Sequence, residues 1–254
     1  MHREIDLPDF FLPVKLDRVA STNAEAVRLA DEGAPEGTLV WAEEQTAGRG
    51  RRGRPWLSPA GNLYCSLVLR PTCAAGDASQ LGFVAGVALA RAAEEVLPKN
   101  RAVTCKWPND VLVDARKVAG VLLDGSIAGH GGCDWVVIGM GVNVCWHPDL
   151  AETLFPATSL AADGAENADP ARFLEILAPI LLDGLRQWRE LGFAPVRSQW
   201  LPRAFGLHQV MNVRLHDKLL NGTFADLDAQ GAMLLVCADG AHAVMAGDVV
   251  SVRA

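Results

Sequence analysis

The stretch Gly48-Arg49-Gly50-Arg51-Arg52-Gly53-Arg54 places four arginines and three glycines in seven consecutive positions. Glycines let backbone N–H groups approach an anion closely, and arginines are permanently charged, planar donors suited to phosphate and carboxylate. A solvated basic loop or an RGG-like nucleic-acid segment is the alternative interpretation. Apolar residues lie on both sides, Val40-Trp41-Ala42 before and Trp56-Leu57 after, so we expect the loop to be anchored at both ends to a β-sheet. The stretch therefore favours a site for an anionic small molecule.

The segments around this loop predict alternating strands and helices. Thr22 followed by Glu25 fits a capping box and predicts a helix from Asn23 to Glu32. An Ala-rich helix is expected from Asp77 to Leu97, stopped by Pro98, and another from Pro170 to about Glu190. Strands are expected at Thr38 to Glu43, Asn62 to Leu69, Ala102 to Lys106, Val111 to Val113, Lys117 to Leu123 and Trp135 to Met140, with a hairpin turn at Asp114-Ala115-Arg116. The segment from His147 to Asp169 is expected to be a loop.

The last fifty residues change character. Turn pairs such as Asn221-Gly222 and Asp239-Gly240 punctuate short apolar runs, a spacing typical of a small barrel. We therefore predict a catalytic domain over residues 1–204 and a small β-barrel domain over residues 205–254. The five predicted strands are Val210 to Leu215, Leu219 to Leu227, Ala232 to Cys237, Ala241 to Met245 and Val249 to Val252.

Composition excludes several classes of protein. The 254 residues are 50% hydrophobic and 21% charged, with a net charge of −7, which is ordinary for a globular chain and excludes disorder and a bulk nucleic-acid coat. No apolar run reaches the roughly 18 residues that span a bilayer. The N-terminus carries acids where a signal peptide has a basic region, so a cytoplasmic location is expected.

The six cysteines are scattered along the chain without a Cys-x-x-Cys pair. We therefore expect them to be small buried hydrophobes in a reducing compartment, and the spacing typical of a metal site built on them is absent. They are Cys65, Cys73, Cys105, Cys133, Cys145 and Cys237.

Three further motifs carry polar groups next to predicted strands. Lys106-Trp107-Pro108-Asn109-Asp110 groups a cation, an amide and a carboxylate on one corner, although it could equally be a surface turn. In Arg116-Lys117-Val118-Ala119-Gly120, Lys117 either faces a ligand or extends along apolar surface to water. Gly139-Met140-Gly141-Val142-Asn143 lacks the third glycine of the dinucleotide fingerprint, but its two glycines permit a close backbone approach. Each motif alone is ambiguous.

Together these motifs resemble those of biotin–protein ligases, which biotinylate the carrier subunit or domain of biotin-dependent carboxylases. The similarity covers about residues 14–200 and extends more weakly over the C-terminal strands. It implies an α+β fold with a mixed central β-sheet flanked by helices, the class II synthetase-like biotin–lipoate ligase fold, plus a small C-terminal SH3-like β-barrel. The motifs that carry it, in order, are Ser21-Thr22-Asn23, Glu44-Gln45-Thr46-Ala47 with the Gly-Arg loop, Lys106 to Asp110, Lys117 to Gly120, Gly139 to Asn143 and Pro156 to Leu160.

The resemblance also implies an activity. The biotin carboxylate would attack the α-phosphorus of ATP to give biotinyl-5′-AMP and pyrophosphate, and a lysine of a biotin carboxyl carrier protein would then take the biotinyl group. Bringing one anion onto a polyanion is opposed by repulsion, so fixed cations and Mg²⁺ would be needed. ATP, biotin and Mg²⁺ are the expected cofactors, and acetyl-CoA carboxylase is the usual source of the carrier in this family.

Residue roles follow from the same resemblance. The catalytic residues would be Lys117, which bridges the biotin carboxylate and α-phosphate, Arg51 on the phosphates, and Asp110. Asp110 would either help the incoming lysine lose its proton or help place Mg²⁺. Arg253 is expected to reach the nucleotide from the barrel. Biotin and nucleotide binding would use Ser21, Thr22, Asn23, Gln45, Gly48, Arg49, Arg54, Trp56, Asn109, Gly120, Leu122, Gly139, Gly141 and Asn143.

Other functions stay open as alternatives. A lipoate or octanoate ligase or transferase shares the fold, and a non-catalytic biotin- or nucleic-acid-binding module would use the basic loop alone. Only about twenty residues precede Ser21, where repressor-type members carry a helix-turn-helix domain, so no specific DNA binding is expected. Asp124 stands where the family often carries Glu. A homodimer through a sheet edge is possible in principle, but no edge can be identified from the sequence.

Overall fold

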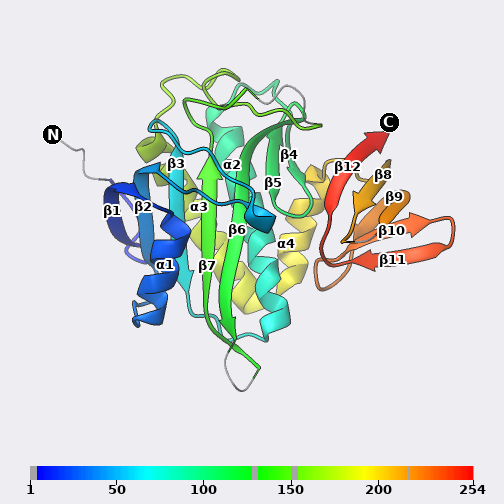
Figure 1. The fold of residues 1–254 in the computed structure, drawn as a ribbon, viewed down its shortest axis with the longest axis horizontal. Coiled ribbons are helices and arrows are strands. Elements are labelled where there is room, and N and C mark those ends of the chain that lie inside the picture. The colour runs from blue at the N-terminus through cyan, green and yellow to red at the C-terminus, as the bar shows by residue number, and fades with distance from the viewer. Residues whose placement is uncertain (1–4, 128–130, 150–153, 217, 254) are drawn as a thin grey trace.

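The computed structural model describes residues 5–127, 131–149, 154–216 and 218–253. Two sheets and four α-helices make up most of this part of the chain (Figure 1). The helices are α1 (Thr22–Asp31), α2 (Gln80–Val96), α3 (Pro170–Leu191) and α4 (Phe193–Trp200), with short 3-10 turns η1 (Arg51–Gly53), η2 (Ala75–Ser79) and η3 (Leu201–Arg203). The strands are β1 (Leu12–Val19), β2 (Thr38–Gln45), β3 (Leu63–Leu69), β4 (Val103–Lys106), β5 (Asp110–Val113), β6 (Arg116–Ile127), β7 (Cys133–Val142), β8 (Val210–Arg214), β9 (Leu219–Leu227), β10 (Met233–Cys237), β11 (Gly240–Val244) and β12 (Asp248–Arg253).

The larger sheet has seven strands in the order β1-β2-β3-β7-β6-β5-β4. Strands β1 and β2 are parallel and every other neighbouring pair is antiparallel, so the sheet is mixed, as predicted. The predicted hairpin between β5 and β6 is confirmed. Its two-residue turn puts Asp114 and Ala115 at positive φ (47° and 62°), the twist that matches two antiparallel strands.

Helices cover both faces of this sheet because successive side chains on each strand point to opposite sides. Helix α1 packs on one face through a small cluster that includes Val40, Val68 and Val137. The neighbouring residues on β2 and β3, such as Leu39 and Leu67, point to the other face and join the main core beneath α2 and α3.

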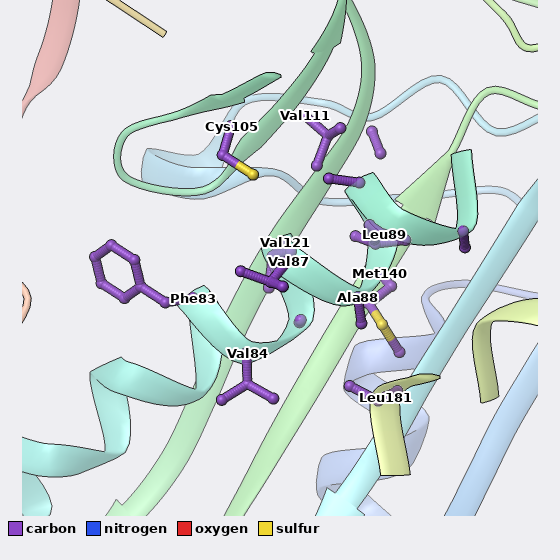
Figure 2. Packing of buried hydrophobic residues seen from close by; sticks show 14 of the residues in the cluster. Phe83, Val84, Val87, Ala88, Leu89, Cys105, Val111, Val121, Met140 and Leu181 are labelled. Atoms are coloured by element: carbon purple, nitrogen blue, oxygen red, sulfur yellow. The ribbon is translucent and has the colours of Figure 1, made fainter. Parts of the chain in front are cut away.

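Helix α2 is buried almost all round, which its Ala-rich sequence permits because small side chains allow close packing. Val87 and Leu89 lie near Val121 of β6 and Met140 of β7, and Leu181 of α3 packs in the same cluster (Figure 2). This layer holds β6 and β7 rigidly from the face opposite α1.

The C-terminal strands form a second, antiparallel sheet in the order β11-β10-β9-β8-β12. All five predicted strands are present. Among the described residues the outer strands β11 and β12 do not pair with each other, so the expected small barrel is seen as an open five-stranded sheet.

The two sheets share one hydrophobic core. Phe83 of α2 makes an edge contact with Trp200 (ring centroids 5.4 Å apart), and Trp200 meets Phe224 of β9 (6.3 Å). The indole N–H of Trp107 donates to the carbonyl of Gly231 across the same boundary (3.3 Å). A domain boundary at residue 204 therefore stays a prediction about chain organisation, since packing is continuous across it.

Some local expectations were incomplete or wrong. Strand β1 and helix α4 were not predicted. The N-cap of α1 is Ser21, whose hydroxyl accepts from the Ala24 N–H, whereas Thr22 is inside the helix and its hydroxyl serves another partner. None of the described helices is long and apolar enough to cross a membrane.

The cysteines were expected to be buried, and only two are. Burial raises the pKa of the Cys65 and Cys105 thiols to about 12, which keeps them protonated. Cys73, Cys133 and Cys237 are partly exposed and Cys145 is exposed. Position on the fold, and not spacing along the sequence, decides this difference.

Gly231 allows a test of the shared core. It has φ +86°, and a methyl group added there would lie 2.7 Å from Cε2 of Phe83. We expect Gly231→Ala to lower the free energy of unfolding by about 3 kcal/mol, from backbone strain plus overpacking. Urea unfolding measures this. Gly33→Ala is the matched control, since Gly33 has φ +89° but open space around it, and it should cost only about 1 kcal/mol. Equal effects would contradict the packing argument.

Candidate functional site

A cavity of about 630 Å³ opens on the face of the larger sheet that α1 partly covers. Helix α1 covers one end of this face, and the segment after β2 crosses in front of β7 and β6 (Figure 1). Its lining includes every site residue predicted from the sequence except Gly48 and Arg253, together with Ser66, Lys106, Val121, Met140, Phe155, Arg214, Asp248, Val249 and Val250.

Glycines form the floor of the cavity where larger side chains would fill it. Gly139 and Gly141 of β7 pair with Leu122 and Gly120 of β6. The ring of Trp56 lies directly on this floor: a methyl group at Gly141 would be 2.8 Å from Trp56 Cε2. Trp56, which was predicted as a binding residue, thus lies in the cavity with its ring against the floor itself.

One end of the cavity is a network of neutral polar groups. The backbone N–H and hydroxyl of Thr22 both donate to Oε1 of Gln45 (2.8 and 3.1 Å), and Nε2 of Gln45 donates to Ser58 (2.9 Å). Ser66 lies between Thr22 Oγ1 and Asn23 Oδ1, at 2.9 and 3.0 Å. Register explains why Ser66 is here, because it pairs directly with Gly139 on β3 and β7. This end presents amide and hydroxyl groups at the N-terminus of α1.

Asp124 connects this end to the Gly-Arg loop. Its carboxylate accepts from Nδ2 of Asn23 at 2.6 Å and lies 3.8 Å from Nη2 of Arg49. Asn23 is therefore oriented by the sheet. A methyl group at Gly139 would collide with Asn23 Oδ1, so glycine is needed at that point.

The opposite end is cationic and is organised by Asp110. Its two oxygens accept from Nζ of Lys106 (2.8 Å) and Nζ of Lys117 (2.6 Å), and only 11% of its side chain is exposed. Burial by itself would raise the pKa of Asp110, but the charges and hydrogen bonds of Lys117 and Lys106 hold that pKa well below its ordinary value. Asp110 is consequently a fixed carboxylate at neutral pH and a weak base.

The two lysines reach toward aromatic rings as well. Lys117 Nζ lies 5.3 Å from the centre of the Trp56 ring, and Lys106 Nζ lies 4.9 Å from that of Phe155. Such contacts favour a cation over the ring face. Lys117 lines the cavity, and its predicted contact with a ligand stays a prediction.

Arg51 is the partly buried member of the Gly-Arg loop. Its Nη1 donates to Oδ1 of Asn109 (3.2 Å), and Nδ2 of Asn109 donates to the Val121 carbonyl (2.7 Å). Burial lowers the pKa of Arg51, and the carboxylates of Asp248 and Asp110 oppose that effect. Because Arg51 is partly buried, an anionic ligand beside it would stabilise its charged form.

The C-terminal sheet contributes to the same cavity through Asp248 at the start of β12. Its oxygens pair with Arg52 (2.7 Å) and Arg54 (3.1 Å), so two arginines of the loop are tied to the second sheet. This role was not predicted from the sequence, because it depends on contacts between residues that are about 195 positions apart.

The remaining predicted residues are accounted for as follows. Gly48 lies behind the cavity wall, where a methyl group would meet the Trp56 carbonyl. Asn143 is buried and donates from Nδ2 to the Thr158 carbonyl (2.9 Å). The expectation for the Arg253 side chain lies outside what the structure describes.

The described residues do not fit a protein-held Mg²⁺ at this cavity. Magnesium is bound through free carboxylates and phosphates. The carboxylates in the described lining are those of Asp110 and Asp248, and all four of their oxygens are already in contact with lysine or arginine.

Comparisons with known proteins agree on one family. The biotin/lipoate A/B protein ligase family matches residues 16–143, and the biotin protein ligase C terminal domain matches residues 211–251. The biotin–[acetyl-CoA-carboxylase] ligase of Paracoccus denitrificans is 40% identical over 237 residues, which cover 92% of this chain and 98% of that protein.

Solved structures are similar over almost the whole chain. The biotin protein ligase of Aquifex aeolicus in complex with biotin and ATP has a TM-score of 0.78 and 28% identity, covering 95% of this chain and 98% of that one. The biotin protein ligase of Leishmania major in complex with biotinyl-5-AMP has a TM-score of 0.64 and 27% identity, covering 94% and 98%.

Asp110 predicts a pH dependence of stability. Its pKa is lowered on folding, so its contribution is present above the ordinary pKa of 3.8 and is lost as the pH falls below it. We expect Asp110→Asn to lower the free energy of unfolding by about 3 kcal/mol near pH 7, since it leaves two largely buried ammonium groups without a counter-charge. The gap between the variant and the parent should narrow as the pH falls from 4 to about 3, and it should close only below the lowered pKa of the folded state. Urea unfolding at both pH values measures the gap, and a gap of constant size would rule out the carboxylate as its cause.

Proposed function

Because the chain belongs to the biotin/lipoate A/B protein ligase family, we propose that it is a biotin–protein ligase that activates biotin with ATP to biotinyl-5′-AMP and transfers it to a lysine of a biotin carboxyl carrier protein. The carrier of acetyl-CoA carboxylase is the proposed acceptor, by similarity to the Paracoccus denitrificans enzyme.

The observation that carries this proposal is the polarity of the cavity. Biotin has a neutral ureido group at one end, with two donors and a carbonyl acceptor, and a carboxylate at the other. The Thr22, Gln45 and Ser66 network offers hydroxyl and amide partners for the first, and Lys117 offers a cation for the second. The glycine floor between them would leave a slot for the bicycle and the valeryl chain once the Trp56 ring moves away from it.

Adenylation requires the cationic end. The biotin carboxylate must approach the α-phosphate, and each unit-charge repulsion at about 4 Å costs about 4 kcal/mol at an effective dielectric of about 20. Lys117 and Arg51 are placed to offset this repulsion, and a fixed cation costs no reorganisation when the charge shifts. Arg54 would bind phosphate oxygens after leaving Asp248, and Asn109 and Asn143 would face the nucleotide.

Asp110 is proposed to position Lys117 and not to act as the base. A carboxylate with a pKa well below its ordinary value takes a proton poorly from an incoming lysine. The ammonium groups of Lys106 and Lys117 beside it also disfavour a further cation such as Mg²⁺ at this carboxylate, so no step of this proposal runs through that ion. Lys106 shares the same carboxylate and fixes its orientation.

The polar end also distinguishes biotin from lipoate and octanoate. Neither acid has groups that could use the amide and hydroxyl partners at Thr22, Gln45 and Ser66, so neither would make the hydrogen bonds that the ureido group of biotin can make there. A non-catalytic biotin-binding module would not need the Lys106-Asp110-Lys117 arrangement.

Cytoplasmic location, homodimerisation and the lack of specific DNA binding remain proposals. Edge strand β1 offers unpaired backbone groups that a second copy could use. Sedimentation tests the dimer, and an electrophoretic shift assay with operator DNA tests the third proposal.

Biotin-dependent exchange of pyrophosphate into ATP tests the activity. We expect exchange with biotin and none above background with lipoate or octanoate, because only biotin satisfies both ends of the cavity. Exchange with lipoate instead would show that the chain is a lipoate ligase and would contradict the proposal. Biotin binding without exchange of any kind would favour the binding module.

Two substitutions test the cationic end. Lys117→Ala and Arg51→Ala should each lower the rate of adenylate formation at least about 100-fold, the scale for losing one preorganised charge contact. Single-turnover formation of biotinyl-5′-AMP is the measurement. Arg18→Ala is the control, because Arg18 is an exposed arginine whose ion pair with Glu44 lies on the outer strand. An active Lys117→Ala enzyme would refute the role of Lys117.

A further inference from the structure

The hairpin between β10 and β11 gathers a second set of chemically distinctive side chains. Cys237 ends β10, Asp239 lies in the turn, and His242 lies on β11. Figure 1 places this turn at the outer end of the C-terminal sheet, projecting away from the seven-stranded sheet. The group therefore lies apart from the cavity, and none of the three residues lines it.

Strand register brings the side chains of Cys237 and His242 to one side of the hairpin. Leu235 pairs with His242, and Cys237 points to the same face as Leu235, two residues along β10. That face is the one that packs on the core through Leu235 and Val244, so Cys237 and His242 stand where the core ends. The hairpin therefore brings together three side chains from a stretch of six residues.

The cluster has the dimensions of a metal site. The Sγ of Cys237, one carboxylate oxygen of Asp239 and one ring nitrogen of His242 all lie within 4.8 Å of one another. His242 Nε2 is 2.8 Å from Oδ1 of Asp239. Ligands of a tetrahedral zinc ion, at about 2.0–2.3 Å from the metal, are roughly 3.3–3.8 Å apart. Asp239, with 73% of its side chain exposed, is free to move by the remaining ångström.

Gly222 provides the room for the sulfur. It pairs with Cys237 on β9, and a methyl group at Gly222 would lie 2.7 Å from Cys237 Sγ. The sulfur thus lies over a position without a side chain, and its direction is fixed by the sheet. Cys237 is held in place by the sheet, and Asp239 and His242 follow it within one short hairpin. The loss of conformational entropy on binding an ion is therefore small.

We propose that Cys237, Asp239 and His242 form a binding site for a divalent transition-metal ion, with zinc as the fitting ion, and that the fourth position faces solvent. A thiolate, an imidazole and a carboxylate match zinc, whereas Mg²⁺ and Ca²⁺ take oxygen ligands. The site is separate from biotin activation and is absent from the proposed reaction.

Metal titration of the untagged, full-length protein tests the site. After treatment with a chelator and dialysis, one Zn²⁺ per chain should bind, measured by elemental analysis and by competition with a chromophoric chelator. Co²⁺ in place of Zn²⁺ should give the thiolate-to-cobalt charge-transfer band and the visible bands of a tetrahedral site. Absence of binding at micromolar Zn²⁺ would overturn the proposal.

Variants assign the ligands. Cys237→Ser, Asp239→Asn and His242→Gln should each weaken Zn²⁺ binding at least about tenfold, and Cys237→Ser should remove the charge-transfer band. Cys145→Ser and His208→Asn are the matched controls, since both are exposed residues of the same types outside the cluster, and should bind Zn²⁺ as the parent does. Binding retained in all three ligand variants would overturn the proposal. Far-ultraviolet circular dichroism checks that each variant is folded, and biotin-dependent pyrophosphate exchange should be the same with and without Zn²⁺ at this site.

Discussion

The carboxylate of Asp110, held between the ammonium groups of Lys106 and Lys117, is the interaction on which the candidate site depends. It lies where β4, β5 and β6 meet, so the sheet fixes the lysines before any ligand arrives. Like charges so close together would repel without it. The arrangement keeps two cations at one end of a narrow cavity, and the neutral network around Gln45 then gives the cavity a direction.

The sequence predicted most of this because its strongest signals are local. Glycine, proline and apolar periodicity placed nearly every strand and helix, and the resemblance to biotin–protein ligases brought the motifs together. What it missed depends on tertiary pairing. Strand β1 is an edge strand with no unusual composition. Ser66 reaches the cavity only because it pairs with Gly139, and Asp248 contacts Arg52 across 196 residues.

The C-terminal sheet is part of the site and not an appendage to it. Asp248 pairs with the loop arginines, and Arg214, Val249 and Val250 line the cavity. The sheet is in turn fixed to the larger one by Phe83, Trp200 and Phe224 in a continuous core. A change in that packing would therefore alter the position of the arginines that are proposed to bind phosphate.

The indole of Trp56 rests on Gly141, and its N–H has no hydrogen-bond partner among the described residues. Any ligand that occupies the space over Gly141 must first displace this ring. The measured free energy of binding would then be the free energy of the ligand contacts reduced by the cost of displacing the ring. The same holds for any protein in which only a small fraction of the molecules has the binding-competent conformation. A substitution that weakens the contact between the Trp56 ring and the floor would lower the cost of displacing the ring and so raise the affinity for the ligand. The affinity could therefore change although the contacts between the Gly-Arg loop and the ligand stay the same.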